Sequence, residues 1–216
     1  MIKGVIFDLD GVLVSTDEMH FRAWLRLAGE IGITNFTKED NKKQKGVSRM
    51  ESLEVVLSKG NKVYTGEEKL TFAEQKNGYY IELLQSLNEN AILPGVMETL
   101  NMLKKRGILI GIGSVSKNTP LILEKTSLKM YIDQVSCGLD ITRSKPDPQV
   151  FEIAAAKLGL IKEECMVVED SGAGIIAAKA AHMRTLGVGP EHQQLKADFE
   201  AADLQSEIDW QAILQG

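Results

Sequence analysis

The chain has 216 residues, of which 44% are hydrophobic and 25% are charged, and its formal net charge is -5. These are the proportions of an ordinary globular protein that is long enough to bury a sizeable core. The acidic balance argues against nucleic acid or an anionic membrane as a main partner. No apolar run is long enough to predict a membrane span.

An export segment is also not expected, because two carboxylates interrupt the first residues, MIKGVIFDLDG. Cys137 and Cys165 are too few and too isolated for a disulfide framework or a zinc site. We therefore expect two reduced and mostly buried thiols and a cytoplasmic location. We also expect a monomer.

Short apolar runs alternate with amphipathic stretches along most of the chain. The runs, which are typical of buried parallel strands, are Ile2–Phe7, Ile108–Gly113, Met166–Val168 and Thr185–Val188. The stretches that predict helices are Gly95–Arg106, Thr119–Leu128, Pro148–Leu158 and Gly172–Ala181. This alternation predicts an α/β fold with a doubly wound, mainly parallel sheet.

Residues 15–88 break the alternation and predict an inserted all-helical cap domain, which leaves residues 1–14 and 89–216 as the α/β core domain. Apolar residues at helical spacing indicate the first helix of the insertion: Phe21, Trp24, Leu25, Ala28 and Ile31. Ser15 and Glu18 have the spacing of a capping box for this helix. The segment Asn88–Pro94 is predicted to be the linker back to the core.

Polar groups follow three of the predicted strands. The first strand runs into Asp8-Leu9-Asp10-Gly11, the second into Ser114, and a third into Glu169-Asp170. Ligands of open α/β sheets bind outside the carboxyl ends of the strands, and four carboxylates gathered there would repel one another without a cation. Hard oxygen ligands suit Mg2+. The competing interpretation is that these polar residues are simply solvated at the ends of their strands. It would have to apply to three separate strands at once.

The chain resembles the haloacid-dehalogenase superfamily of phosphotransferases over nearly its whole length. The resemblance lies in four features that occur in this order: FDLDGVL, a serine at a strand end, SKPDP and VVEDSGAGI. The resemblance implies that Asp8 is a nucleophile that becomes phosphorylated and that Asp10 is the general acid and base. It implies one Mg2+ held by Asp8, Asp10, Glu169 and Asp170. It also implies a transferring phosphoryl group held by Ser114, Lys145 and the backbone amide of Val115.

The predicted helical insertion carries a second group of candidates for binding an anion. Arg49 can hold phosphate through two hydrogen bonds, and Ser116, Lys117 and Asn118 add donors from the core. Each candidate alone has a plainer interpretation. His20 could lie on a helix surface, Lys42, Lys43 and Lys45 could form a solvated basic patch, and Lys76 could be an exposed helix lysine.

Taken together, HFRAW, KQKGVSR, the Lys76 helix and SVSKN resemble the β-phosphoglucomutase family within that superfamily. This implies interconversion of β-D-glucose 1-phosphate and glucose 6-phosphate through β-glucose 1,6-bisphosphate, which also acts as activator. Arg49, Ser116, Lys117 and Asn118 would bind the non-transferring phosphate, and His20 would couple substrate binding to Asp10. The sugar side of the cap would be lined by Lys45, Gly46, Val47, Ser48, Ser52 and Lys76, and Thr16 would lie at the first hinge.

Three positions, Ser15, Gln44 and Val115, depart from the pattern of that family, and the exact sugar and the pathway stay open. The main alternative is a phosphatase of the same superfamily that hydrolyses small sugar phosphates with the same Asp8, Asp10 and metal site. A non-catalytic phosphate-binding domain is a second alternative, which would not need the Asp8 and Asp10 pair. A dinucleotide-binding fold is a weak third, because no GxGxxG motif follows the first strand.

Overall fold

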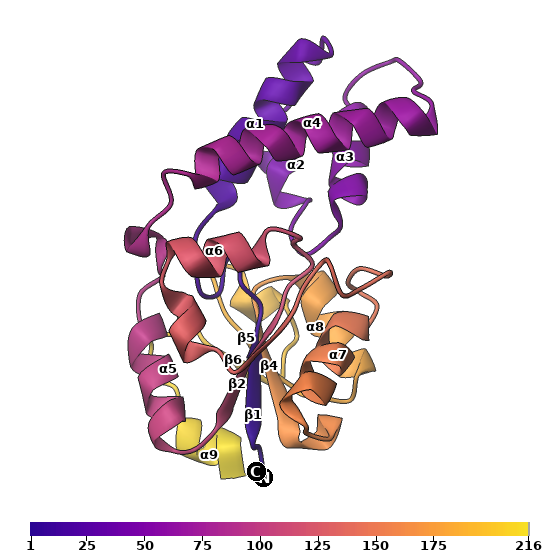
Figure 1. The fold of residues 1–216 in the computed structure, drawn as a ribbon. Coiled ribbons are helices and arrows are strands. Elements are labelled where there is room, and N and C mark those ends of the chain that lie inside the picture. The colour runs from indigo at the N-terminus through magenta and orange to yellow at the C-terminus, as the bar shows by residue number, and fades with distance from the viewer. Residues whose placement is uncertain (216) are drawn as a thin grey trace.

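A computed structural model describes residues 1–215, and its centre is a six-stranded sheet (Figure 1). In spatial order the strands are β3 (Gln134–Ser136), β2 (Leu109–Gly113), β1 (Gly4–Phe7), β4 (Cys165–Glu169), β5 (Arg184–Gly187) and β6 (Phe199–Glu200). Every pair of neighbouring strands is parallel, which confirms the predicted α/β fold. Phe7 is in register with Ile112 and with Val168, so the residues that follow β1, β2 and β4 meet at one edge.

Helices cover both faces of the sheet (Figure 1). Val5 and Phe7 of β1 point into one apolar cluster, while Ile6 between them points into the other, as the two-residue period of a strand requires. The first cluster includes side chains of α5 (Val96–Lys105), α6 (Thr119–Lys125) and α9 (Trp210–Gln215). The second includes side chains of α7 (Gln149–Leu158) and α8 (Gly172–Ala180). Short 3-10 helices span Glu89–Ala91, Leu128–Tyr131, Lys162–Glu164 and His192–Gln194.

Four helices lie beyond the carboxyl edge of the sheet (Figure 1): α1 (Asp17–Glu30), α2 (Lys38–Lys42), α3 (Arg49–Leu57) and α4 (Gly66–Leu84). We call this part the cap and the remainder the core. The cap has its own apolar cluster, built around Trp24, Leu27 and Leu53. The two connections to the core run side by side, because Ser15 N donates to the Ala91 carbonyl at 2.9 Å and Leu93 N donates to the Leu13 carbonyl at 3.0 Å. The domain limits at 14/15 and 88/89 stay a prediction.

The local predictions hold in part. The four predicted strands and the four predicted core helices are confirmed, and no end differs by more than three residues. The capping box of Ser15 and Glu18 is wrong: α1 begins at Asp17, its N-cap is Thr16, and the Thr16 side chain makes no capping bond. Leu25 is also not a packing residue, since it is 42% exposed. The strands β3 and β6 were not predicted, because QVS and FE are short edge segments without an apolar run.

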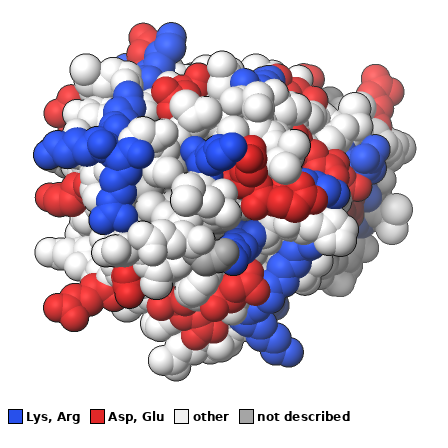
Figure 2. Space-filling model, turned by 90° about the horizontal axis from the view of Figure 1, so that it is seen from below, with Lys and Arg blue, Asp and Glu red and all other residues white. Residues whose placement is uncertain are grey.

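On the face of the core that points away from the cap, acidic and basic side chains are interspersed (Figure 2). Cys137 and Cys165 are both free and buried, as expected. None of the helices within residues 1–215 is long and apolar enough to cross a bilayer.

Candidate active site

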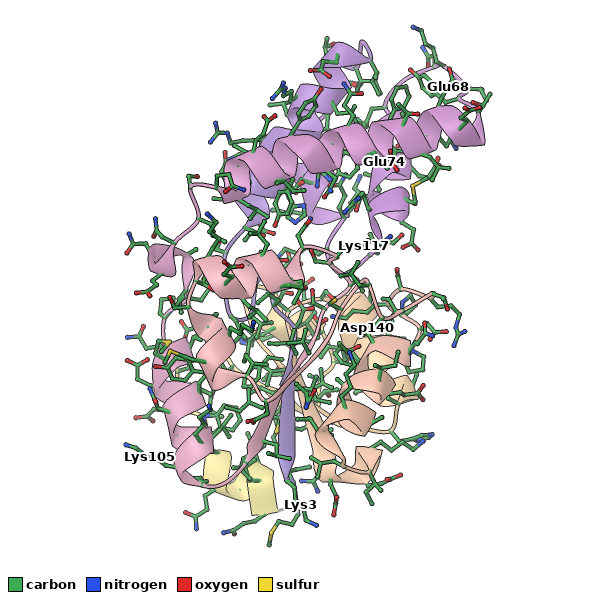
Figure 3. All side chains as sticks on the ribbon, in the orientation of Figure 1. Lys3, Glu68, Glu74, Lys105, Lys117 and Asp140 are labelled. Carbon is green, nitrogen blue, oxygen red and sulfur yellow. The ribbon has the colours of Figure 1, made fainter. Side chains whose placement is uncertain are left out.

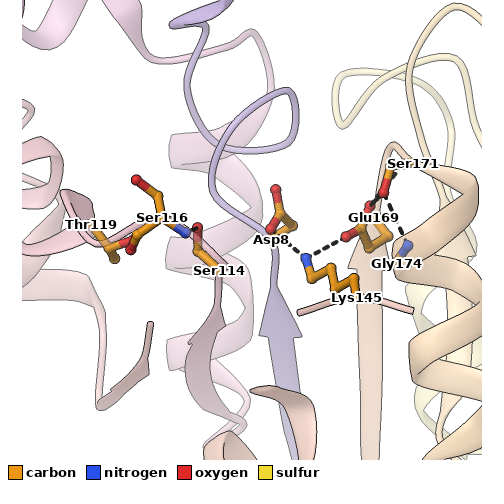
Figure 4. A network of polar contacts seen from close by, with 8 residues as sticks. All are labelled: Asp8, Ser114, Ser116, Thr119, Lys145, Glu169, Ser171 and Gly174. Carbon is orange, nitrogen blue, oxygen red and sulfur yellow. Dashed lines mark hydrogen bonds and ion pairs between the residues drawn. The ribbon is translucent and has the colours of Figure 1, made fainter. Parts of the chain in front are cut away.

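The floor of the site is organised by Lys145, whose side chain is completely buried. Its Nζ donates to Asp8 Oδ1 at 2.6 Å and to Glu169 Oε1 at 2.5 Å (Figure 4). The other Glu169 oxygen, Oε2, accepts from the amide and the hydroxyl of Ser171 at 2.8 and 2.9 Å. Lys145 therefore links Asp8, which directly follows β1, to Glu169, which is the last residue of the neighbouring strand β4.

Burial and neighbouring charges together set the pKa values of Lys145 and Asp8. Burial lowers the pKa of Lys145, but the charges of Asp8 and Glu169 outweigh it, so the pKa is raised and the lysine stays charged. Burial raises the pKa of Asp8 well above its usual value; Lys145 opposes the shift, and the charges of Glu169 and Asp170 add to it. The carboxylates of Asp8, Glu169 and Asp170 outnumber the lysines that contact them, Lys145 and Lys45, so further positive charge at Asp8 is favourable.

Two structural features decide whether Mg2+ fits here. Gly11 has φ +86, and a side chain there would overlap the carboxyl group of Asp170, so Asp170 packs directly on the Asp10–Gly11 backbone. Within residues 1–215 no three acidic, histidine or cysteine side chains form a ready cluster for a metal ion. Mg2+, however, usually takes only one or two carboxylates and keeps several waters. The Asp8 carboxylate, the Asp10 carbonyl and the Asp170 carboxylate would meet that demand, and their role as ligands stays a prediction.

Glu169 differs from the other predicted metal ligands. Lys145 and Ser171 occupy its two oxygens, and the residue is completely buried. In this arrangement Glu169 holds Lys145 in place, and its role as a direct ligand stays a prediction.

Asp10 lies two residues beyond Asp8 in the loop that follows β1. It accepts a hydrogen bond from the hydroxyl of Thr16, which in turn accepts one from Tyr80 Oη at 3.0 Å. Burial raises the pKa of Asp10 to about 6, against the lowering effect of the Thr16 hydrogen bond. A carboxyl group with a pKa near neutrality can both take and give a proton at physiological pH.

The loop after β2 forms the wall on the other side of Asp8, which lies between Ser114 and Lys145 in Figure 4. Ser114 is buried, and its Oγ accepts from the Ser116 amide at 3.2 Å. Ser116 Oγ accepts from the Asn118 amide at the same distance. Asn118 Nδ2 then donates to Asn77 Oδ1 of α4 at 2.9 Å, so this loop touches the cap directly.

The loop before α3 brings the cap onto the core from the opposite direction. Lys45 Nζ lies 2.8 Å from Asp170 Oδ2 and 3.7 Å from Asp17 Oδ2. Gly46 has φ +72, and a side chain there would overlap the Ser171 hydroxyl. Ser48 then caps α3 through a capping box with Glu51. Lys42 and Lys43 are exposed and pair with Glu39 and Asp40, so the solvated interpretation holds for them and fails for Lys45.

The roof of the site contains Lys76 and His20, and both plainer interpretations are wrong for them. Lys76 is 3% exposed, and its Nζ lies 2.8 Å from His20 Nδ1. The His20 ring is stacked on Tyr80 with 4.0 Å between ring centroids. Burial, with help from the charge of Arg49, lowers the pKa of Lys76 to about 7. Burial and the charges of Lys76 and Arg49 hold the pKa of His20 well below its usual value.

A cavity of about 590 Å³ lies between cap and core and collects these side chains. Most of the predicted site residues line it: Asp8, Asp10, His20, Lys45, Gly46, Val47, Ser48, Arg49, Ser52, Lys76, Ser114, Val115, Ser116, Lys117, Asn118 and Asp170. Thr16, Lys145 and Glu169 are buried beside the cavity. Glu74 of α4 and Lys117 of the loop after β2 face each other across the space between cap and core (Figure 3).

Sequence reasoning missed several cavity residues on α4, notably Asn77, Tyr80 and Glu74. Ala73, Lys76, Asn77 and Tyr80 follow the i, i+3, i+4, i+7 spacing of one helix face. Because Lys76 was already a candidate, this spacing could have identified Asn77 and Tyr80 as its neighbours. Gln44 was noted only as a departure. Its Nε2 donates to the Ser52 carbonyl at 3.0 Å, while its Oε1 is buried and has no hydrogen-bond partner among residues 1–215.

A doubly wound sheet with a helical cap over an aspartate pair, a buried lysine and a second acidic pair defines a class of phosphate-handling proteins. The family model of the haloacid dehalogenase-like hydrolases matches residues 5–188. The chain belongs to this family.

Individual members of the family that are similar to this chain have more specific names. The chain is 39% identical to the β-phosphoglucomutase of Bacillus subtilis (strain 168), and the match covers 96% of this chain and 93% of that protein. The crystal structure of β-phosphoglucomutase from Clostridium difficile superimposes with a TM-score of 0.92 at 36% identity, over 100% of this chain and 96% of that one. A phosphorylated carbohydrates phosphatase of Thermotoga maritima is 30% identical, over 93% of this chain and 91% of that protein.

The depressed pKa of Lys76 predicts a pH-dependent stability. Between pH 7 and the higher pKa of an unfolded lysine, the unfolded chain binds one more proton than the folded chain, so the free energy of unfolding rises with pH. Between pH 7.5 and 9.5, wild type should gain on the order of 2 kcal/mol relative to Lys76→Met in urea denaturation.

The control for this measurement is Lys62→Met, which removes an exposed cap lysine and should follow the wild type at every pH. A difference between wild type and Lys76→Met that stays constant over this range would contradict the lowered pKa of the buried Lys76.

Proposed function

We propose that this protein interconverts β-D-glucose 1-phosphate and glucose 6-phosphate through an aspartyl phosphate at Asp8 and a β-glucose 1,6-bisphosphate intermediate. The similarity to two β-phosphoglucomutases over nearly the full chain supports the reaction. The bisphosphate in the role of activator and intermediate rests on the chemistry of the cavity.

The observation that carries the proposal is that two sets of groups suited to phosphate border one cavity. One set surrounds Asp8 and comprises Ser114 and Lys145, with Lys145 directly on the carboxylate. The other comprises Arg49 from the cap and Lys117 and Asn118 from the core. A phosphatase needs only the first set, whereas a mutase must hold both phosphates of a bisphosphate.

The ionisation of the cap supports the same conclusion. Burial lowers the pKa of Arg49, with Glu74 opposing, and Lys76 is disfavoured as a cation by burial and by Arg49. A bound phosphate would relieve this cost, because its charge favours both cations. Binding of an anion and closure of the cap therefore reinforce each other.

In the first half-reaction the phosphoryl group of phosphorylated Asp8 passes to the 6-hydroxyl of β-glucose 1-phosphate. The sugar oxygen forms its bond to phosphorus, the bond from phosphorus to the Asp8 oxygen breaks, and Asp10 takes the hydroxyl proton. Lys145 and Ser114 stabilise the charge on the transferring oxygens. Arg49 meanwhile holds the phosphate on C1.

In the second half-reaction the bisphosphate lies the other way round, so that Arg49 holds the phosphate on C6. The Asp8 carboxylate attacks the phosphorus on C1, and the bond from that phosphorus to the C1 oxygen breaks. Asp10 returns its proton to this oxygen, which releases glucose 6-phosphate and leaves Asp8 phosphorylated again. Each cycle therefore conserves both the proton and the phosphoryl group.

The proposed mechanism has two further requirements, positive charge near Asp8 and the exclusion of water. Mg2+ at Asp8, Asp10 and Asp170 would supply positive charge that reduces repulsion between the carboxylate and the phosphoryl oxygens. The contacts of Asn77 with Asn118 and of Lys45 with Asp170 hold the cap against the core. A closed cap excludes the water that would otherwise hydrolyse the aspartyl phosphate.

The test is a coupled assay that follows glucose 6-phosphate formed from β-glucose 1-phosphate with Mg2+ and a trace of the bisphosphate. The proposal expects glucose 6-phosphate with little free phosphate. Release of phosphate alone would show a sugar phosphatase, the activity that the 30% identical relative carries in its name.

The second phosphate set predicts a selective effect of Arg49→Ala. The loss of charged hydrogen bonds to the distal phosphate should lower mutase kcat/KM at least about tenfold more than it lowers hydrolysis of p-nitrophenyl phosphate, which has no second phosphate. Arg22→Ala, which removes an exposed arginine of α1, is the matched control and should change neither rate. Equal losses in both assays for Arg49→Ala would count against a distal anion site.

A further inference from the structure

The first helix of the cap is capped differently from the other three. The helices α2, α3 and α4 each begin with a complete capping box, with N-cap residues Thr37, Ser48 and Thr65. Thr16 occupies the N-cap of α1, yet its side chain makes no capping bond. A threonine at this position normally stabilises the helix by binding a free backbone amide. Its hydroxyl donates to the carboxylate of Asp10 instead.

The hydroxyl of Thr16 is directed toward Asp10 by a second buried group. Tyr80 is completely buried, and its hydroxyl donates to Thr16 Oγ1 at 3.0 Å. A hydroxyl has one proton to give and lone pairs with which to accept. Because Tyr80 supplies the proton on one side of Thr16 Oγ1, the Thr16 proton is committed to Asp10. The order of donation is therefore Tyr80 to Thr16 to Asp10.

Tyr80 also connects this chain of hydrogen bonds to the roof of the cavity. Its ring is stacked on His20 at 4.0 Å, and the Nζ of Lys76, one turn earlier on α4, lies 4.8 Å from the ring centroid. Lys76 Nζ is itself 2.8 Å from His20 Nδ1. The groups that face a ligand from the cap thus rest on the same aromatic ring that orients Thr16.

We propose that Tyr80 is a positioning residue for Asp10, which acts through the Thr16 hydroxyl and makes the placement of the acid and base depend on helix α4. The inference rests on the proposed role of Asp10 in proton transfer. Tyr80 itself does not transfer a proton to substrate. Its hydroxyl removes the freedom of Thr16 to turn toward the amides at the start of α1.

The experiment is a double-mutant cycle with Tyr80→Phe, Thr16→Val and the combined variant, measured in the mutase assay. Tyr80→Phe removes one oxygen from a buried ring and should lower kcat about fivefold to tenfold with KM unchanged, the effect of one hydrogen bond. Thr16→Val should lower kcat at least as far. If Tyr80 acts only through Thr16, the combined variant should match Thr16→Val alone.

Tyr79→Phe is the matched control, because it removes the neighbouring hydroxyl of the same helix, which bonds Glu30 at 2.5 Å on the cap surface. It should leave kcat unchanged. Thr16→Ser keeps the hydroxyl and should keep both the activity and its sensitivity to Tyr80→Phe. Losses of Tyr80→Phe and Thr16→Val that multiply in the combined variant, or a Tyr80→Phe enzyme with wild-type kcat, would overturn the proposal.

The same cycle separates this inference from the proposed function. If the wild type releases phosphate and forms no glucose 6-phosphate, the mutase proposal fails, and the cycle is then measured on phosphate ester hydrolysis, which also needs an acid and a base. Non-additive losses there would support the role of Tyr80 even though the substrate was wrong. Additive losses would reject it.

Discussion

The site depends on the burial of one lysine between carboxylates of neighbouring strands. Lys145 is completely buried and lies within hydrogen-bond distance of both Asp8 and Glu169. Removing one partner of such a group leaves an uncompensated buried charge, which costs several kcal/mol. The sheet must therefore bring β1 and β4 side by side with Phe7 opposite Val168, because another register would separate the carboxylates from their lysine. The pairing of β1 with β4 is therefore required both for the sheet and for the site.

Charged side chains of both signs line the cavity, and the carboxylates around Asp8 lie opposite three cations of the cap. Asp8, Asp10 and Asp170 belong to the core, whereas Lys45, Arg49 and Lys76 belong to the cap and face them. Attraction draws the parts together, as the contact between Lys45 and Asp170 illustrates. The cations of the cap lie partly buried beside one another, so an anionic ligand between them is favoured. The proposed bisphosphate intermediate would place one phosphate at Asp8 and the other near Arg49.

Much of the core was predictable from sequence, because buried parallel strands are continuous apolar runs and their polar ends must share an edge. The set of Asp8, Ser114 and Glu169 followed from that rule alone. From its residue pattern alone the cap was predictable only as helices, and Lys76 and His20 entered the predicted site through the family resemblance. The burial of Lys76 beside His20 arises from tertiary packing against Trp24 and Tyr80. The start of α1 was predicted wrongly, because the signal of Ser15 and Glu18 is local whereas Thr16 is held by Asp10 and Tyr80, which lie elsewhere in the chain.

In the proposed mechanism the carboxylate of Asp8 accepts the phosphoryl group, and trapping the resulting aspartyl phosphate tests this most directly. The protein is incubated with β-glucose 1,6-bisphosphate and Mg2+, quenched in acid and reduced with borohydride, which converts an aspartyl phosphate to homoserine. Peptide mass spectrometry should find homoserine at position 8 and unchanged aspartate at position 10. Homoserine at position 10, or at neither position in a protein that turns over the sugar phosphate, would contradict it.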